Sequence, residues 1–268
     1  VEQLTTLEAI ASEASPILDV VRTNDRDDAS STASLSPWLS ARQPVFLPRH
    51  SFIPSSLPML PDLPSPMHSS LLSYYLDKIC PITVPSSVNK SPFANLILPF
   101  SITSSPAVLE ALLALAACHR SKNDTAFRST SLKLGHNVLR TLRGRLATED
   151  ALQVAMDPET LVIMMILCQY EIINECDKRW VVHLKGARDL IRVRRNAQLY
   201  LSSGQSSNEL VEFAEKYFAF QDVIGRTACG EEPIFGSDFW TSQGEDTDAW
   251  LGCSAGLVSI LCEITELS

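Results

Sequence analysis

Apolar residues recur at helical spacing along most of the chain after residue 66. The segment SSLLSYYLDKIC carries four of them at i, i+3, i+4 and i+7, which predicts one buried helix face made of Leu72, Tyr75, Leu76 and Ile79. Because proline lacks an amide donor and clashes with the preceding turn, we expect Pro81 and Pro85 to end this helix. A short apolar helix or turn, SPFANLILPF, is expected to end at Pro99.

Capping signals mark the two helices that follow. Ser105 is a predicted N-cap, with Pro106 in the first position of the helix AVLEALLALAACHR. This helix is apolar on nearly all sides and is therefore predicted to be central. Asp124 is predicted to cap a long helix that runs to Ala147, with an inward face made of Phe127, Leu134, Val138, Leu142 and Leu146. Glycine costs about 1 kcal/mol inside a helix, so close packing is expected at one of its two glycines, Gly135 and Gly144.

Four further helices are predicted toward the C-terminus. Asp157-Pro158-Glu159 supplies a cap, a first-position proline and a first-turn acid to a helix that contains LVIMMILC and runs to Asn174. The next stripe is apolar apart from its histidine and consists of Trp180, His183, Leu184, Ala187, Leu190 and Ile191. A capping box at Ser206 and Glu209 opens a helix with the inward residues Leu210, Phe213, Tyr217, Phe220 and Ile224. The last helix is expected to turn inward Leu257, Ile260, Leu261 and Ile264.

Two regions follow from these patterns. Residues 1–66 hold nine of the sixteen prolines and eleven serines without a sustained period, so we expect a largely disordered linker or tail. Within it, LTTLEAIASEA could form a short amphipathic helix and PVFLP could dock on a groove, but a tethered tail is favoured. Residues 67–268 are predicted to form an all-α domain, an antiparallel helical array whose end at Ser268 can fall inside a longer domain. The chain lacks an initiator Met and a signal peptide, and we expect it to be cut from a longer protein.

Composition and charge narrow the class of protein. The two clean apolar runs are eight residues each, too short to cross a membrane, and seven cysteines without a C-x-x-C motif favour reduced thiols in an intracellular protein. Residues 67–200 carry 16 basic and 11 acidic side chains, a net +5, whereas residues 201–268 carry 2 and 12, a net −10. The best nucleic-acid candidate is a basic helix surface made of Lys185, Arg188, Arg192, Arg194 and Arg195. It lacks interleaved aromatic residues, so a solvated face, or one that meets the acidic C-terminal part, is favoured.

One short motif raises the question of enzyme activity. Residues 252–256 read G-x-S-x-G, the spacing around the nucleophile of serine hydrolases, with Ser254 as the serine. No run of β-branched residues precedes it and no histidine follows it, so small residues that pack closely at a helix start are favoured over catalysis. His183 is interpreted as a hydrogen-bonded core residue, and Cys168 and Cys176 make only a weak zinc candidate. We assign no catalytic, cofactor-binding or metal-ligating residue and expect no enzyme.

The order of the segments resembles one family. Over about residues 68–268, six segments in this order are similar to the C-terminal regulatory domain of fungal-specific binuclear zinc cluster (Zn(2)-C6 type) transcription factors. They are SSLLSYYLDKICPITVP, NKSPFANLILPFSITSSPAVLEALLALAACHRSK, DPETLVIMMILCQYEI, WVVHLKGARDLI, FQDVIGRTACGEEPIF and DAWLGCSAGLVSILCEITEL. The two most specific stretches are Trp180-x-x-His183-Leu184-x-Gly186-Ala187 and Leu251-Gly252-Cys253-Ser254. The resemblance implies that the second stretch begins a helix of the regulatory core and has no chemical role.

The same resemblance implies a function and its partners. We expect a regulatory or effector domain of a nuclear protein that controls RNA polymerase II transcription, often as a homodimer, with transcriptional co-regulators as partners. The zinc cluster of the family needs C-x2-C-x6-C trios, and no two cysteines here are closer than eight residues, so zinc and DNA are expected only at a module absent from this chain. The alternative is a helical scaffold or orphan regulator that does not bind DNA. A small hydrophobic pocket, if present, is expected among Met164, Met165, Phe213 and Tyr217.

Overall fold

The computed structural model of the chain describes residues 66–83, 91–174, 179–201, 208–241, 247–248 and 250–266. The linker expected over residues 1–66 therefore lies outside the described residues except for Pro66. Helices are the regular elements of the described ranges, which confirms the all-α class, and one isolated bridge joins Thr247 to Ser254.

The five long helices of the described residues lie in the middle of the sequence, with shorter elements before, between and after them. The first elements are α2 (Pro66–Tyr74), the π-helical turn η1 (Tyr75–Ile79), α3 (Cys80–Thr83), the π-helical turn η3 (Phe93–Ile97) and α4 (Leu98–Thr103). The middle set is α5 (Pro106–Ser121), the 3₁₀ turn η4 (Thr125–Phe127), α6 (Arg128–Thr148), α7 (Ala151–Met156), α8 (Pro158–Asn174), α9 (Arg179–Leu201) and α10 (Glu209–Cys229). The chain continues through α11 (Asp238–Thr241) to α12 (Ala255–Glu266). The five long helices are α5, α6, α8, α9 and α10.

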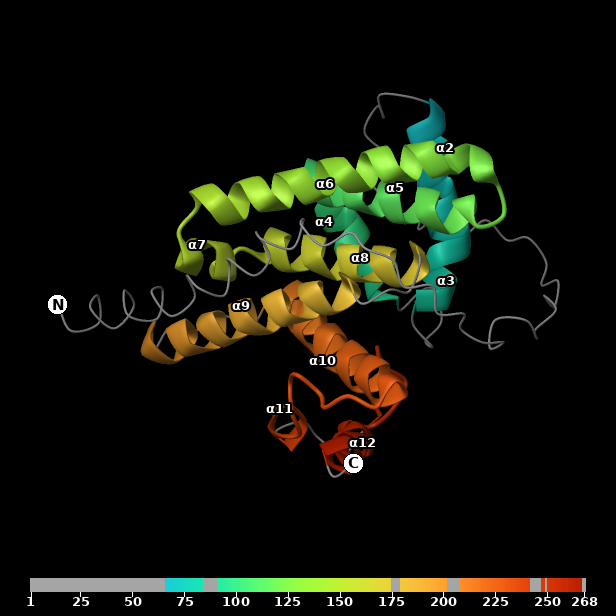
Figure 1. Cartoon of the computed structure of the whole chain (residues 1–268). Helices are drawn as coiled ribbons and strands as arrows, with labels where there is room; N and C mark the ends of the chain where they lie inside the picture. Colours follow the sequence, from blue (N-terminus) through green and yellow to red (C-terminus); the bar gives the residue numbers. More distant parts are fainter. Residues whose placement is uncertain are drawn as a thin grey trace, which may run out of the picture.

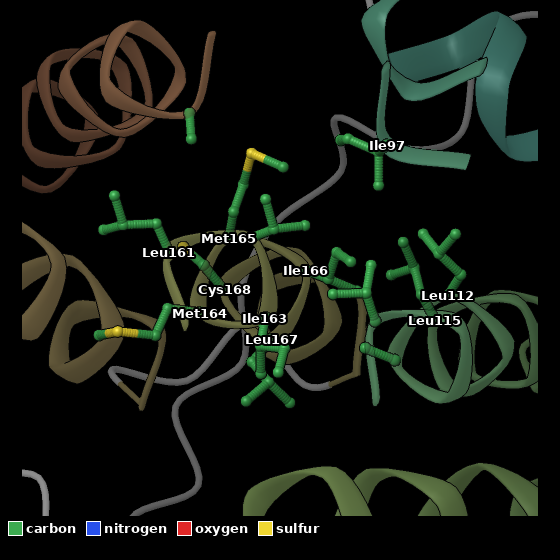
Figure 2. Close-up of a cluster of buried hydrophobic side chains, with 14 of the residues drawn as sticks. Ile97, Leu112, Leu115, Leu161, Ile163, Met164, Met165, Ile166, Leu167 and Cys168 are labelled. Atoms are coloured by element: carbon green, nitrogen blue, oxygen red, sulfur yellow. The ribbon is translucent and has the colours of Figure 1, made fainter. Parts of the chain in front are cut away.

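The long helices form a layered array. In Figure 1, α6 lies along one outer edge, α5 and α8 come next, α9 follows, and α10 crosses toward the end that holds α11 and α12. The main core surrounds α8, whose residues 160–168 are all buried, and Figure 2 shows its side chains leaving the helix in several directions, with Ile166 toward Leu112 and Leu115 of α5. A second, smaller core contains Ala219, Val223, Phe239, Trp240, Leu251, Ala255, Val258 and Cys262. Helix α10 contributes to both cores and connects them.

Several predicted caps are confirmed. The Ser105 hydroxyl accepts a hydrogen bond from the Val108 amide at 3.1 Å, and Asp157 Oδ1 accepts one from the Glu159 amide at 3.0 Å. Asp124 caps the short 3₁₀ turn that leads into α6. The predicted inward face of α6 is buried at four positions, with Phe127 partly buried against the core. The short helix α7, capped by Asp150, is an element that the sequence pattern did not indicate.

Close packing occurs at one glycine of α6, as expected. A Cβ atom on Gly135 would lie 3.0 Å from the Cζ and hydroxyl atoms of Tyr170, whereas one on Gly144 would meet no atom within 4 Å. The absence of a side chain at residue 135 therefore lets α8 approach α6, while Gly144 has no such role.

Two predicted helix ends are wrong. The chain continues in helical conformation through Pro81 to Thr83 and through Pro99 to Thr103. In both places a π-helical turn precedes the proline by one residue, and its closing amide bonds the carbonyl five residues earlier. The wider turn displaces the carbonyl that a proline ring would otherwise strike, so the helical conformation continues past the proline. Pro85 lies outside the described residues.

The predictions for α10 and α12 need three corrections. The N-cap of α10 is Asn208, whose side-chain oxygen accepts from the Leu210 amide at 3.1 Å, so Glu209 is the first helical residue and Ser206 lies outside the described residues. Ile224 is 44% exposed instead of buried. In α12 the predicted inward residues are largely outward, with exposed fractions between 50% and 57% at Leu257, Ile260 and Ile264, and Leu261 only partly buried.

The physical reason for the α12 error is that its apolar residues surround the helix. The residues that meet the core are smaller and also recur at helical spacing: Ala255, Val258, Cys262 and Thr265. Periodicity alone cannot choose between two such stripes.

Candidate functional site

The first of the two specific stretches forms the buried face at the start of α9. Its five residues are all buried: Trp180, His183, Leu184, Gly186 and Ala187. The carbonyl of Trp180 accepts a hydrogen bond from the Cys168 thiol of α8 at 3.8 Å. The Trp180 indole lies directly on α10, because a Cβ atom built on Gly225 would be only 2.5 Å from Cη2 of the indole. Gly225 is thus needed for this contact, and sequence reasoning had assigned it no role.

His183 is a core residue, as predicted, but its Nδ1 atom lacks the expected hydrogen bond. Its side chain is 6% exposed and Nδ1 has no hydrogen-bond partner in the part of the chain that the structure describes. Burial, followed by the positive charge of Arg143, lowers the pKa of His183 to about 4. The imidazole is therefore neutral at physiological pH.

The second stretch, residues 251–254, forms a tight loop before α12. Asp248 Oδ1 accepts hydrogen bonds from the amides of Trp250 and Leu251 at 2.8 and 3.1 Å. The Gly252 amide then donates to the Asp248 carbonyl at 2.8 Å, with a φ of 72° that favours glycine. The Cys253 carbonyl accepts from the Asp248 amide at 3.0 Å and closes the loop.

Ser254 acts as the N-cap of α12. Its hydroxyl oxygen accepts a hydrogen bond from the Leu257 amide at 3.3 Å. The segment before it is a hydrogen-bonded loop and not the strand that a nucleophile elbow requires. The expected close packing is not found at Gly256, where an added Cβ would meet no atom within 4 Å. The serine spacing is thus explained by a helix cap and a glycine turn.

Helix α10 holds this loop through a cation and two aromatic rings. Lys216 Nζ lies 3.1 Å from Asp248 Oδ2 and 5.2 Å from the centroid of the Trp250 ring. The Trp250 ring packs edge-on against Phe213, with centroids 5.5 Å apart. Burial lowers the pKa of Lys216, but its bonds and charge interactions with Asp248 and Glu212 outweigh burial and raise it. Both specific stretches therefore pack against α10.

A buried carboxylate that sequence reasoning missed fixes the segment after α10. Asp222 is fully buried, and its Oδ2 accepts hydrogen bonds from the amides of Ile234 and Phe235 at 2.5 and 2.8 Å. Burial raises the pKa of Asp222, while these two amides and Arg226 partly oppose the shift. The only sequence signal was an acidic residue on the buried side of an amphipathic helix.

The basic surface predicted on α9 serves mainly to hold the fold together. Arg194 is buried and donates from Nη1 to the carbonyls of Ala155 and Met156, at 3.3 and 2.9 Å, where α7 ends. Arg195 donates from Nε and Nη2 to Oε2 of Glu215 in α10, at 2.9 and 2.7 Å, and its guanidinium lies 4.5 Å from the Phe239 ring centroid. The remaining members are Arg188, paired with the adjacent Asp189, and the exposed Lys185 and Arg192. The expected contact with the acidic C-terminal part is thus present at Arg195.

The residues proposed for a hydrophobic pocket are packed in the main core. Met164, Met165, Phe213 and Tyr217 are all buried. Figure 2 shows that Met164 and Met165 leave α8 in different directions, so they do not face one common space. The Phe213 and Tyr217 rings contact each other at 6.1 Å between centroids.

The described residues contain neither a metal-binding cluster nor a helix able to span a membrane. No group of three potential metal-binding side chains occurs among the described residues, where Cys168 is a buried free thiol and Cys176 is not covered. The six cysteines that the structure describes are all free thiols. Within the described ranges, no helix has both the length and the apolar character needed to cross a bilayer.

The chain was compared with known proteins at three levels. Neither the curated proteins nor the solved structures gave a match. The family model described as "Fungal specific transcription factor domain" matches residues 70–268, which include both specific stretches and all of α5 to α12. This match covers well over half of the chain and agrees with the all-α array. The chain therefore belongs to the family of the fungal specific transcription factor domain.

Proposed function

We propose that this chain is the regulatory or effector domain of a transcription factor that controls RNA polymerase II transcription in the nucleus. The observation that carries the proposal is the family match over residues 70–268. The two specific stretches pack against α10, one at Gly225 and the other, through Asp248, at Lys216. A partner that displaced the loop at Asp248 would act on α10 through Lys216, and α10 contacts Trp180 at Gly225.

In this proposal DNA is bound by a zinc-cluster module outside the chain. The spacing of the cysteines does not provide the two C-x2-C-x6-C trios of such a cluster. The described cysteines are also distributed among α3, α5, α8, α10, the 251–254 loop and α12. Zinc is therefore assigned to no residue of this chain.

The proposed partners are transcriptional co-regulators and a second copy of the protein. Sedimentation of the purified chain at two concentrations tests self-association. A mass of one chain at both concentrations would remove the homodimer from the proposal without affecting the regulatory role.

The natural transcript upstream of Val1 tests the proposal against the scaffold alternative. We expect it to encode six cysteines in two C-x2-C-x6-C trios followed by a basic stretch. A reading frame that starts close to Val1 without these cysteines would contradict DNA binding by such a cluster and would favour an orphan regulator or scaffold.

A further inference from the structure

Helix α6 presents a positively charged outer face. It contains five basic residues and no acidic residue, namely Arg128, Lys133, Arg140, Arg143 and Arg145. Arg145 is neutralised by Glu149, Asp157 and Glu159. Three others are exposed, Arg128, Lys133 and Arg140, and these three are called the α6 basic face. Figure 1 shows α6 along an outer edge of the array.

The charge of the α6 basic face is not balanced by the described part of the fold. Among the described residues, no carboxylate forms an ion pair with Arg128, Lys133 or Arg140. Glu110 of α5 also contacts the helix, but it accepts a hydrogen bond from the Asn137 side-chain amide, at 3.0 Å, and not from one of these three cations. Arg140 donates a hydrogen bond to the Asn137 side-chain oxygen at 3.4 Å, which is a neutral partner. An acidic partner would therefore meet cations that no carboxylate of the described residues neutralises.

An apolar spot adjoins this face at the point where residues 1–65 join the fold. Leu132 of α6 is 53% exposed and Met67 of α2 is 47% exposed. The Thr130 hydroxyl of α6 lies 3.5 Å from the Met67 sulfur, so the start of α2 touches the first turns of α6. The segment that precedes Met67 is consequently tethered beside the α6 basic face.

We propose that the acidic segment of residues 1–28 docks on the α6 basic face. This segment contains seven acidic and two basic residues, a net −5, whereas residues 29–65 contain only one acidic residue, Asp62. It also carries apolar residues among the acids, including Leu4, Leu7 and Ile10, which suit the exposed Leu132 and Met67. Both the opposite charge and the apolar residues thus favour residues 1–28 as the segment that binds the α6 basic face.

The length of the connection permits this contact. Residues 29–65 form a tether of 37 residues, with a maximum reach of about 120 Å. The 21 residues of α6 extend over about 31 Å, so the tether reaches every part of the α6 basic face. A tethered segment also has a high effective concentration, so weak surface charges suffice for binding.

Docking would regulate access to the acidic segment. Acidic segments with interspersed apolar residues resemble those through which activation regions bind their partners. Held on α6, the segment would be shielded, and a more basic partner or high salt would release it. This inference rests on the proposed function and extends it. If the docking were disproved, the proposed function would still stand, because the family match concerns residues 70–268 and not residues 1–28.

Zero-length carbodiimide cross-linking of the full chain tests the docking. The reagent joins a lysine amine to a carboxylate in direct contact, and Lys133 is the only lysine of α6. We expect peptide mapping to show links from Lys133 to carboxylates of residues 2–28 that disappear at high salt. The exposed Lys78 and Lys185, on η1 and α9, are the internal controls.

Two sets of variants separate docking from loss of folding. Arg128→Glu with Arg140→Glu leaves Lys133 as the reporter and should reduce its links about tenfold, whereas Lys78→Glu with Lys185→Glu, matched in charge change, should not. Glu8→Gln with Glu13→Gln changes only the acidic segment and should also reduce the links.

Three results would overturn the proposal. The first is the absence of links from Lys133 to residues 2–28, and the second is equal links to Lys78, Lys133 and Lys185. The third is found by mixing ¹⁵N-labelled and unlabelled chains: links that join labelled to unlabelled peptides would show contact between two molecules.

Discussion

Replacing His183 with a side chain that does not titrate should weaken the effect of acid on the stability of the domain. The imidazole is buried, and its pKa falls from 6.5 to about 4 because burial, and then Arg143, disfavour its charged form. Between these two values the unfolded chain binds a proton that the folded chain does not bind. The free energy of unfolding therefore decreases as the pH falls from about 6.5 toward 4.

The magnitude follows from the pKa difference. Each pH unit in this window changes the free energy of unfolding by about 1.4 kcal/mol per proton. Between pH 7 and pH 5, the His183 contribution is then about 2 kcal/mol, equivalent to a decrease of roughly 4–8 °C in the melting temperature of a domain of this size. The raised pKa of Asp222 acts in the opposite direction, so the wild-type slope alone does not isolate His183.

The assay compares wild type, His183→Gln and His136→Gln by urea denaturation at pH 7 and pH 5. We expect His183→Gln to lose about 2 kcal/mol less than wild type over this interval. His136→Gln, which replaces an exposed histidine of α6, serves as the matched control. Equal losses in wild type and His183→Gln would refute the reasoning, because they would show that the buried imidazole is not excluded from protonation.

Further predictions concern packing, capping and charge. Gly225→Ala should lower the free energy of unfolding by about 1–2 kcal/mol, because the clash of the new methyl group with the Trp180 indole exceeds the gain in helix propensity. Gly144→Ala, where the methyl group meets no atom, should raise the free energy of unfolding by up to about 1 kcal/mol, and thermal melting measures both changes. Ser254→Ala should cost about 1 kcal/mol through loss of the α12 cap, and wild type should not be labelled by a serine-directed phosphonate; labelling would contradict the structural role. Arg194→Ala should cost about 2–3 kcal/mol by leaving the last carbonyls of α7 unpaired, while Lys185→Ala, on the exposed side of α9, should stay within about 0.5 kcal/mol in urea denaturation.

Features decided by local chemistry were predictable from the sequence. The caps at Ser105 and Asp157 use hydrogen bonds within three residues, so the residue types alone indicate them. The buried face of α9 was also correct, because its apolar stripe is interrupted only by His183.

Features decided by neighbours distant in the sequence were not predictable. Pro81 and Pro99 are tolerated because a π-helical turn precedes each, and the Tyr75 hydroxyl of one turn donates to the Phe93 carbonyl of the other at 3.2 Å. Arg194 was assigned to a solvated face, or to one that meets the acidic C-terminal part, because the charge pattern carries no information about the nearby end of α7. The inward face of α12 depends on which of two stripes meets α10 and α11.

For the candidate site, the sequence indicated the two specific stretches but not that both pack against α10. Trp180 was identified from the apolar stripe and from the resemblance to the family. That it packs on Gly225 of α10 is shown only by the structure. Asp248 was likewise missed, because its bonds to the loop and to Lys216 require the folded arrangement.

A tethered transcription assay tests the central claim, a regulatory role, most directly. The chain is fused to a DNA-binding module from an unrelated protein, and transcription of a reporter gene with sites for that module is measured. We predict a change from the level given by the module alone, loss of this change with Trp180→Ala, and its retention with Gly144→Ala at equal protein amounts. A folded, nuclear fusion that leaves reporter transcription at the level of the module alone would contradict the account.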